Sequence, residues 1–109
     1  MFIDTHTHLY SEEFNEDRIA SINLAMEKGV EKFYMPNVDS TSIEDMLALE
    51  VHFPEHCYPM MGLHPCSVKE NYREELDIVK RWLDLRRFSA IGEIGIDLYW
   101  DKTFIKEQE

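Results

Sequence analysis

Short runs of β-branched and aromatic residues alternate along the chain with segments in which apolar residues recur every three or four positions. The short runs predict strands over residues 2–8, 32–35, 58–63 and 90–96. The apolar periods between them predict three helices, and a fourth period begins after Asp101. This alternation is typical of a parallel α/β fold.

Residues that favour helix ends bound the predicted helices. Gly29 follows the first apolar period and Pro54 follows the second, so each should end a helix. Short polar side chains precede each period and are expected to cap the free amides of the first turn. The expected caps are Asn15, the pair Thr41 and Glu44, the pair Asn71 and Glu74, and Asp101.

The strands and helices form four βα units of about 30 residues, a length typical of one strand and one crossover helix. The fourth period has only begun when the sequence reaches Glu109. A closed barrel of eight such units needs about 250 residues. We therefore expect residues 1–109 to form one domain, the N-terminal half of a TIM-type (β/α)8 barrel truncated within the fourth helix. Its open edges could pair with a second copy.

The first predicted strand carries two histidines one residue apart. Side chains alternate across a strand, so Asp4, His6 and His8 should share one face. Two imidazoles on one face can bind one metal ion, whereas the alternative is a pair of structural histidines in the core. Three polar side chains in register are costly to bury without partners, and this favours the metal site.

The fourth predicted strand carries a glutamate between two glycines. By the same alternation Glu93, Gly95 and Asp97 should share a face. Glycine inside a strand tends to mark the close approach of a ligand or backbone, although a bulged strand with a surface glutamate is an alternative. In a barrel the carboxyl ends of the first and fourth strands face the same mouth, where active sites form. His64, at the end of the third strand, opens onto that mouth either as a site residue or as a loop histidine held by nearby backbone.

Composition limits the classes of partner. The chain has 11 Lys and Arg against 22 Asp and Glu, a formal net charge of -11, which excludes the basic surface of a non-specific nucleic-acid binder. A polyanionic substrate would therefore need bound cations. Cys57 and Cys66 do not form a C-x-x-C pair and are expected to be reduced thiols. The sequence shows neither a signal peptide nor a membrane span, which predicts a cytoplasmic location.

Three segments carry a family resemblance. Residues 4–9 (DTHTHL), 62–65 (GLHP) and 92–97 (GEIGID), in this order, resemble the N-terminal signatures of the TatD family of metal-dependent deoxyribonucleases. The resemblance covers essentially the whole chain and implies a metallo-dependent hydrolase barrel. It implies that His6 and His8 bind one divalent ion and that the catalytic Glu93 bridges it to a second. Histidine and carboxylate ligands suit zinc, magnesium or manganese. We expect His64 and Asp97 to contact the substrate.

The implied activity is hydrolysis of phosphodiester bonds at a 3′ end of DNA. Family members commonly have an acidic or amide residue after the H-x-H-L element, where this chain has Tyr10, and they draw further ligands from later strands that this sequence does not contain. The activity is therefore expected of the intact parent. Two alternatives remain open: a related hydrolase of a cyclic amide or ester, and an inactive half-barrel that self-associates.

Overall fold

Three parallel strands form the centre of the fold. The computed structural model describes residues 1–109, and its sheet has the order β1 (Phe2–Asp4), β2 (Val30–Pro36) and β3 (Cys57–Met60). Both pairings are parallel, with Asp4 opposite Phe33 and Phe33 opposite Cys57. The predicted α/β fold with parallel strands is confirmed.

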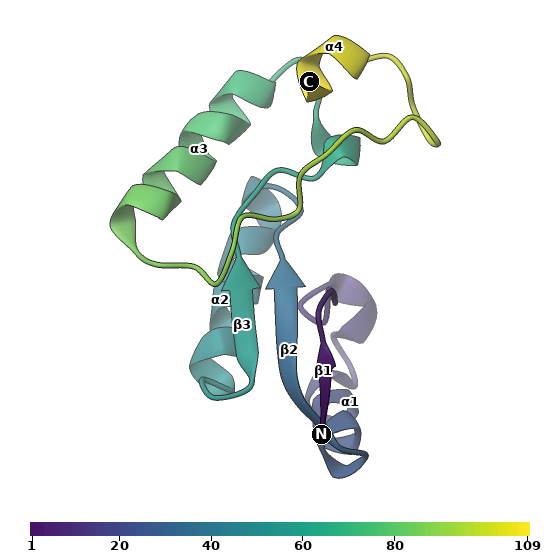
Figure 1. The fold of residues 1–109 in the computed structure, drawn as a ribbon, viewed down its shortest axis with the longest axis vertical. Coiled ribbons are helices and arrows are strands. Elements are labelled where there is room, and N and C mark those ends of the chain that lie inside the picture. Colours follow the sequence, from purple (N-terminus) through teal and green to yellow (C-terminus); the bar gives the residue numbers. More distant parts are fainter.

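Helices connect the strands and extend beyond the last one. Helices α1 (Arg18–Glu27) and α2 (Ile43–His52) link successive strands and lie behind the sheet in Figure 1. Helix α3 (Tyr72–Leu85) stands to one side of the carboxyl end of the sheet, and the short α4 (Ile105–Gln108) lies near the upper end of α3. None of these helices has the length and apolar composition required to cross a membrane.

The core lies between the sheet and the helices behind it. Ile22 of α1, Met35 of β2 and Met46 of α2 are fully buried there. Buried apolar side chains of this size contribute most of the free energy that favours folding. The complete cluster comprises Leu9, Tyr10, Ile22, Phe33, Met35, Ile43, Met46, Leu49, Cys57, Met61, Leu63, Val68 and Val79.

The start of the first helix differs from the prediction. Asn15 does not cap it; it ends a short 3-10 helix over Glu12–Phe14, and α1 begins at Arg18. The Asn15 Oδ1 atom accepts a hydrogen bond from Arg18 Nη2 at 2.9 Å, so the Asn15 side chain binds a guanidinium and does not cap the backbone amides of α1. The predicted end at Gly29 is confirmed, because this residue adopts φ +101° just beyond the helix.

The capping box before the second helix starts two residues earlier than predicted and belongs to a 3-10 turn, not to α2 itself. The side chain of Asp39, rather than that of Thr41, accepts the capping hydrogen bond. Its Oδ1 lies 2.9 Å from the Thr41 amide nitrogen. Ser42 completes the capping box by accepting from the Asp39 amide at 3.3 Å, so the expected pair of Thr41 and Glu44 is wrong. A turn of 3-10 helix (Ser40–Ser42) precedes α2, which explains the offset.

The third helix is confirmed, but its expected cap is wrong. Asn71 precedes α3 without a side-chain cap hydrogen bond. Near its start Glu75 ties this helix to the loop before α2, because its carboxylate accepts from the Ser40 amide at 2.9 Å and the Ser40 hydroxyl at 2.7 Å. The contact joins segments 35 residues apart, which local capping rules cannot anticipate.

Asp101 does not begin the last helix. Its Oδ1 accepts from the Thr103 amide at 2.9 Å, which forms a local turn, and α4 starts later, at Ile105. An Asp side chain bonded to an amide two residues on is a turn motif that competes with helix.

The first and fourth strands are shorter than predicted. β1 ends at Asp4, whose Oδ1 accepts from the His6 amide at 3.1 Å, a local bond that competes with strand pairing. The expected fourth strand is reduced to a single bridge between Met61 and Ile91. After this bridge the segment leaves the sheet edge as an irregular loop (Figure 1), in which Gly95 adopts φ +142°.

Candidate metal centre

His6 and His8 lie on the irregular segment that follows β1, at the carboxyl end of the sheet. The Thr7 amide donates to the Tyr34 carbonyl at 3.1 Å, which keeps this segment beside β2. The two Nε2 atoms are 3.2 Å apart. The predicted convergence of the two imidazoles is therefore present, although the strand that was expected to produce it has already ended. Asp4 does not join the group that could hold an ion.

Glu93 reaches the same point from the irregular segment between α3 and α4. Its amide donates to the Asn37 carbonyl at 3.1 Å, and the Asn37 amide donates to the Gly92 carbonyl at 3.1 Å. These two backbone hydrogen bonds hold the glutamate over the end of β2. The Gly92–Glu93 peptide bond is cis.

Asn37 was missed by sequence reasoning, although it organises this end of the sheet. It is fully buried, and its Nδ2 donates to the carbonyls of Asp39 and Gly62, each at 3.0 Å. Its Oδ1 accepts from the Ser42 hydroxyl at 2.8 Å. One side chain thus joins the loops after β2 and β3. The available signal was a polar residue directly after a buried strand.

Gly62, the first residue of the 62–65 segment, has a structural role that the sequence analysis did not assign. A Cβ at this position would lie 2.7 Å from the Gly92 carbonyl carbon and 2.8 Å from the Glu93 carbonyl oxygen. Only a residue without a side chain allows the backbone that carries Glu93 to approach so closely. The close approach predicted at the two glycines around Glu93 holds for one of them: a Cβ on Gly92 would lie 2.5 Å from Cε of Met60, whereas a Cβ on Gly95 would meet nothing within 4 Å.

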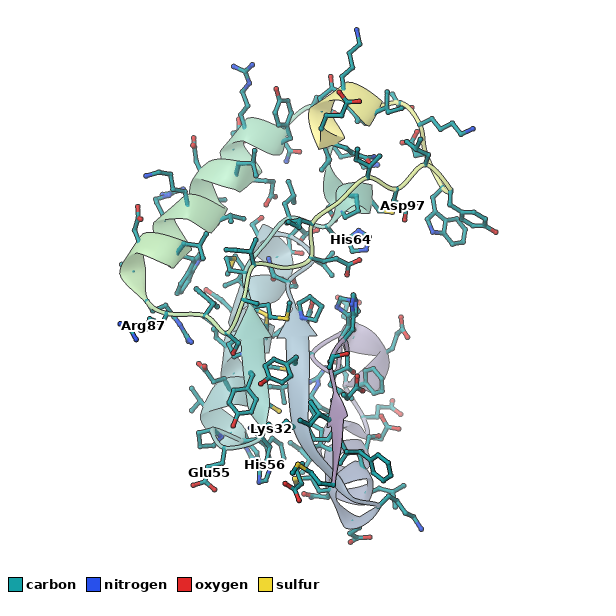
Figure 2. The ribbon with its side chains drawn as sticks, viewed as in Figure 1. Lys32, Glu55, His56, His64, Arg87 and Asp97 are labelled. Carbon is teal, nitrogen blue, oxygen red and sulfur yellow. The ribbon has the colours of Figure 1, made fainter.

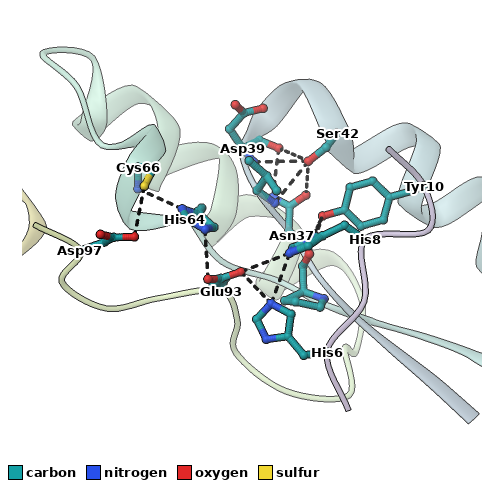
Figure 3. Close-up of polar contacts among 12 residues, drawn as sticks. His6, His8, Tyr10, Asn37, Asp39, Ser42, His64, Cys66, Glu93 and Asp97 are labelled. Carbon is teal, nitrogen blue, oxygen red and sulfur yellow. Dashed lines mark hydrogen bonds and ion pairs between the residues drawn. The ribbon is translucent and has the colours of Figure 1, made fainter. Parts of the chain in front are cut away.

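The carboxylate of Glu93 lies among three imidazoles (Figure 3). Its Oε2 is 3.0 Å from Nε2 of His6 and 3.4 Å from Nε2 of His8. This oxygen is buried, yet no hydrogen bond satisfies it. The ligand atoms of His6, His8 and Glu93 all lie within 4.8 Å of one another. Two imidazoles and a carboxylate are a donor set that suits zinc, and a divalent ion among them would satisfy the unpaired oxygen.

His64 holds the other oxygen of the same carboxylate. Its Nδ1 accepts from the Cys66 amide at 2.9 Å, so the neutral ring carries its proton on Nε2. That Nε2 lies 3.0 Å from Oε1 of Glu93 and can donate to it. Nearby backbone therefore orients His64, one of the two possibilities left open by the sequence, and the ring in turn orients Glu93. The expected contact of His64 with substrate stays a prediction.

Asp97 lies apart from this cluster. Figures 2 and 3 place it beyond His64, where its carboxylate accepts from the Tyr99 amide at 2.9 Å and from the Cys66 thiol at 3.4 Å. The Tyr99 amide is the main cause that lowers the pKa of Asp97. The expected shared face with Glu93 is wrong, because alternation applies only within a strand and none forms here.

Tyr10 lies behind His8. Its hydroxyl is 2.9 Å from Nδ1 of His8 and donates to the Pro36 carbonyl at 2.5 Å. Only 2% of Tyr10 is exposed, and burial raises the pKa of its hydroxyl. Burial also lowers the pKa of His8, while the nearby Glu93 charge opposes that shift. Burial thus favours the neutral phenol of Tyr10 and the neutral imidazole of His8.

The two cysteines are free thiols, as predicted. Burial raises the pKa of Cys57 to about 11. The pKa of Cys66 is also raised, first by desolvation and then by its hydrogen bond to Asp97. Neither thiol belongs to the group that could hold an ion.

The site lies at the carboxyl end of the sheet. Figure 2 shows His64 and Asp97 at this end, and Lys32, Glu55 and His56 at the opposite end. In parallel α/β folds, ligands bind at the carboxyl ends of the strands. The position of the cluster therefore agrees with a binding site.

Known proteins resemble this chain over nearly its whole length. The family described as TatD related DNase matches residues 3–109. An uncharacterized metal-dependent hydrolase, YjjV of Escherichia coli K12, is 32% identical over 110 residues, which cover 99% of this chain and 42% of the relative. A 3′-5′ ssDNA/RNA exonuclease, TatD of Erwinia tasmaniensis, is 29% identical over 94 residues, covering 86% of this chain and 36% of the relative.

A solved structure supports the same relationship. The crystal structure of YjjV, a TatD homologue from Escherichia coli K12, superposes with a TM-score of 0.86 at 32% sequence identity. The match covers 98% of this chain and 42% of that chain. The chain thus spans about two-fifths of the length of these relatives.

Proposed function

Because this chain belongs to the TatD-related DNase family, we propose that His6, His8 and Glu93 hold a divalent ion in a hydrolase that cleaves phosphodiester bonds in DNA. The observation that carries the proposal is the buried Oε2 of Glu93, which has no hydrogen bond and lies within 3.4 Å of two imidazole nitrogens. The name of the YjjV relative, a metal-dependent hydrolase, agrees with this donor set.

Each residue of the site has a distinct task in this proposal. When bound, a divalent ion lowers the pKa of a coordinated water and neutralises charge on phosphate oxygens. His6 and His8 supply neutral nitrogen ligands, and Glu93 supplies the carboxylate. His64 holds Oε1 of Glu93 at 3.0 Å and so turns Oε2 toward the two imidazoles. A second ion would also use Glu93, and zinc, manganese and magnesium all suit such a set.

The substrate we propose is a DNA end, processed from its 3′ side. A chain with a net charge of -11 repels the phosphate backbone at long range, so a substrate would be held locally by bound cations. Local binding suits an enzyme that acts at an end rather than one that follows a duplex. The Erwinia relative is named a 3′-5′ ssDNA/RNA exonuclease, which supports this direction. In this proposal the substrate approaches past His64, which contacts Glu93, and Asp97, which lies beyond His64.

We further propose that the active species is a TIM-type (β/α)8 barrel to which this chain supplies the first four βα units. Its relatives are more than twice as long. The apolar side chains of Phe2 and Ile3 on the free edge of β1 are 66% and 46% exposed, and those of Ile94 and Ile96 are 64% and 56% exposed. Further strands of a barrel would cover both groups. A stable dimer of the 109-residue chain in solution would instead favour the self-associating half-barrel.

The deciding experiment measures cleavage of a single-stranded DNA oligonucleotide by the full-length protein. The double variant His6→Ala with His8→Ala should lose metal-dependent cleavage while keeping the wild-type circular dichroism spectrum, because it removes ligands and little packing. His52→Ala, at the exposed end of α2, is the matched control and should retain activity.

Two results would contradict the proposal. Cleavage at the wild-type rate by the double variant would exclude these histidines as ligands. Turnover of a dihydropyrimidine or a lactone, with no cleavage of DNA, would assign the site to the hydrolases of cyclic amides or esters.

A further inference from the structure

The hydroxyl of Tyr10 lies between two polar atoms and has one proton to give. It is 2.5 Å from the Pro36 carbonyl oxygen and 2.9 Å from Nδ1 of His8 (Figure 3). A carbonyl oxygen only accepts hydrogen bonds, so the Tyr10 proton points to Pro36. Nδ1 of His8 must therefore be the donor in its contact with the Tyr10 oxygen.

This assignment determines the state of the other ring nitrogen of His8. A neutral imidazole carries a single proton, and with that proton on Nδ1 the Nε2 atom presents a lone pair. Nε2 of His8 lies 3.4 Å from Oε2 of Glu93, which also presents lone pairs. The two atoms repel each other unless a cation lies between them. We infer that Tyr10 is a positioning residue that keeps His8 protonated on Nδ1 and so presents its Nε2 to the metal ion.

The position of the Tyr10 hydroxyl is set by the fold. The side chain belongs to the hydrophobic core, with 2% of the residue exposed. The Arg18 side chain fixes the backbone of Tyr10 and of its two neighbours. It donates hydrogen bonds to the carbonyls of Leu9, Tyr10 and Ser11 at 2.8, 3.1 and 2.7 Å. The acceptor, Pro36, ends β2. Neither partner can move without disturbing the core, so the contact is well suited to orient a ligand.

His64 shows the opposite arrangement. Its Nδ1 accepts from the Cys66 amide, which places the proton on Nε2 and directs it at Glu93. The rings of His8 and His64 contact the two oxygens of the Glu93 carboxylate, but different groups bind their Nδ1 atoms, so the two rings have different roles. His8 offers a lone pair to the ion, and His64 donates a hydrogen bond to the carboxylate. The partner of Nδ1 therefore distinguishes the ligand from the residue that supports it.

Outer partners of this kind have a measurable effect on metal binding. Groups that hydrogen-bond the second nitrogen of a ligating histidine select its tautomer, and their loss typically lowers metal affinity about 10- to 100-fold. The inference rests on the metal role proposed above for His8. It adds that a neutral phenol, with its own proton given to a backbone carbonyl, makes this selection.

The experiment compares wild-type protein with Tyr10→Phe, which removes the hydroxyl and keeps the ring. The tautomer of His8 is measured in the metal-free protein at neutral pH from the 15N shifts of its ring nitrogens. Affinity for Zn²⁺ is measured by calorimetry. Tyr34→Phe is the matched control, because the Tyr34 ring stacks on Tyr58 at 5.2 Å and its hydroxyl makes no hydrogen bond within the chain. Backbone amide spectra report whether each variant is folded.

We expect wild-type His8 to carry its proton on Nδ1, and Tyr10→Phe to lose that preference together with about 10- to 100-fold in Zn²⁺ affinity. Tyr34→Phe should match wild type in both measurements. A wild-type His8 protonated on Nε2 would overturn the inference, whether or not the variant folds. So would unchanged Zn²⁺ affinity in a folded Tyr10→Phe. Because the tautomer is read without substrate, failure to cleave DNA would refute the proposed function and leave this inference intact.

Discussion

Gly62→Ala is the substitution that most directly tests how the site is assembled. Gly62 does not have a positive φ, so alanine would fit the local backbone without strain. The added Cβ would lie 2.7 Å from the Gly92 carbonyl carbon, where ordinary contact begins at 3.4 Å. The backbone that carries Glu93 must therefore move by about 0.7 Å to restore van der Waals separation.

The collision is with backbone, which cannot rotate away. Insertion of one methyl group into a closely packed region typically costs about 1–3 kcal/mol, and we expect the free energy of unfolding to fall by that amount. The displaced segment also carries Glu93 away from His6 and His64, each now 3.0 Å from its carboxylate. Metal affinity should fall together with stability.

The assay is urea denaturation of the metal-free chain, followed by calorimetric titration with Zn²⁺. Gly92→Ala is the matched comparison, because its Cβ would meet Cε of Met60, the mobile end of a flexible side chain. We expect a smaller loss of stability from it than from Gly62→Ala. If Gly62→Ala unfolds at the wild-type urea concentration and binds Zn²⁺ as tightly as wild type, the close approach does not organise the site.

Two further predictions concern the carboxylates. Glu93→Gln keeps an acceptor for the hydrogen bond from His64 but removes the negative charge. In the full-length protein it should therefore lower the affinity for a second bound ion more than the affinity for the first. Calorimetry that finds two unchanged metal sites would count against a bridging role for Glu93. Asp97→Asn should speed alkylation of Cys66 by iodoacetamide at a fixed pH near 9, because the Asp97 charge is one of the causes that raise the pKa of this thiol. Peptide mass spectrometry separates Cys66 from the buried Cys57, and identical pH profiles for variant and wild type would contradict the assigned contact.

Much of the fold could be predicted because its signals are local. The strands predicted over 32–35 and 58–63, the second of which ends at Met60 in the structure, follow from periodicity and from the backbone preferences of glycine and proline. So do the second and third helices and the stop at Gly29. Helix starts were predicted less well. The Asp39 capping box and the tie between Glu75 and Ser40 depend on a 3-10 turn and on a contact across 35 residues.

The histidine pair shows why a correct expectation can rest on an incomplete reason. Alternation along a strand predicted that His6 and His8 converge, and they do, but β1 has ended at Asp4. The same reasoning failed for Asp97, because no strand forms beyond the single bridge at Ile91 and alternation does not apply there. Residue spacing is informative over two positions and loses its meaning where the backbone leaves the strand.

The order of residue types along the chain was enough to determine the class of fold, the reduced state of the thiols and the identity of the residues that could bind a metal, because each depends on the chemistry of the residue or on its near neighbours. Tertiary structure alone decided which groups surround them. Gly62 allows Glu93 to approach, Asn37 joins the loops beneath it, and Tyr10 reaches both Pro36 and His8. Except for the contact between Tyr10 and His8, these contacts join positions 25 or more residues apart, and only packing brings such positions together.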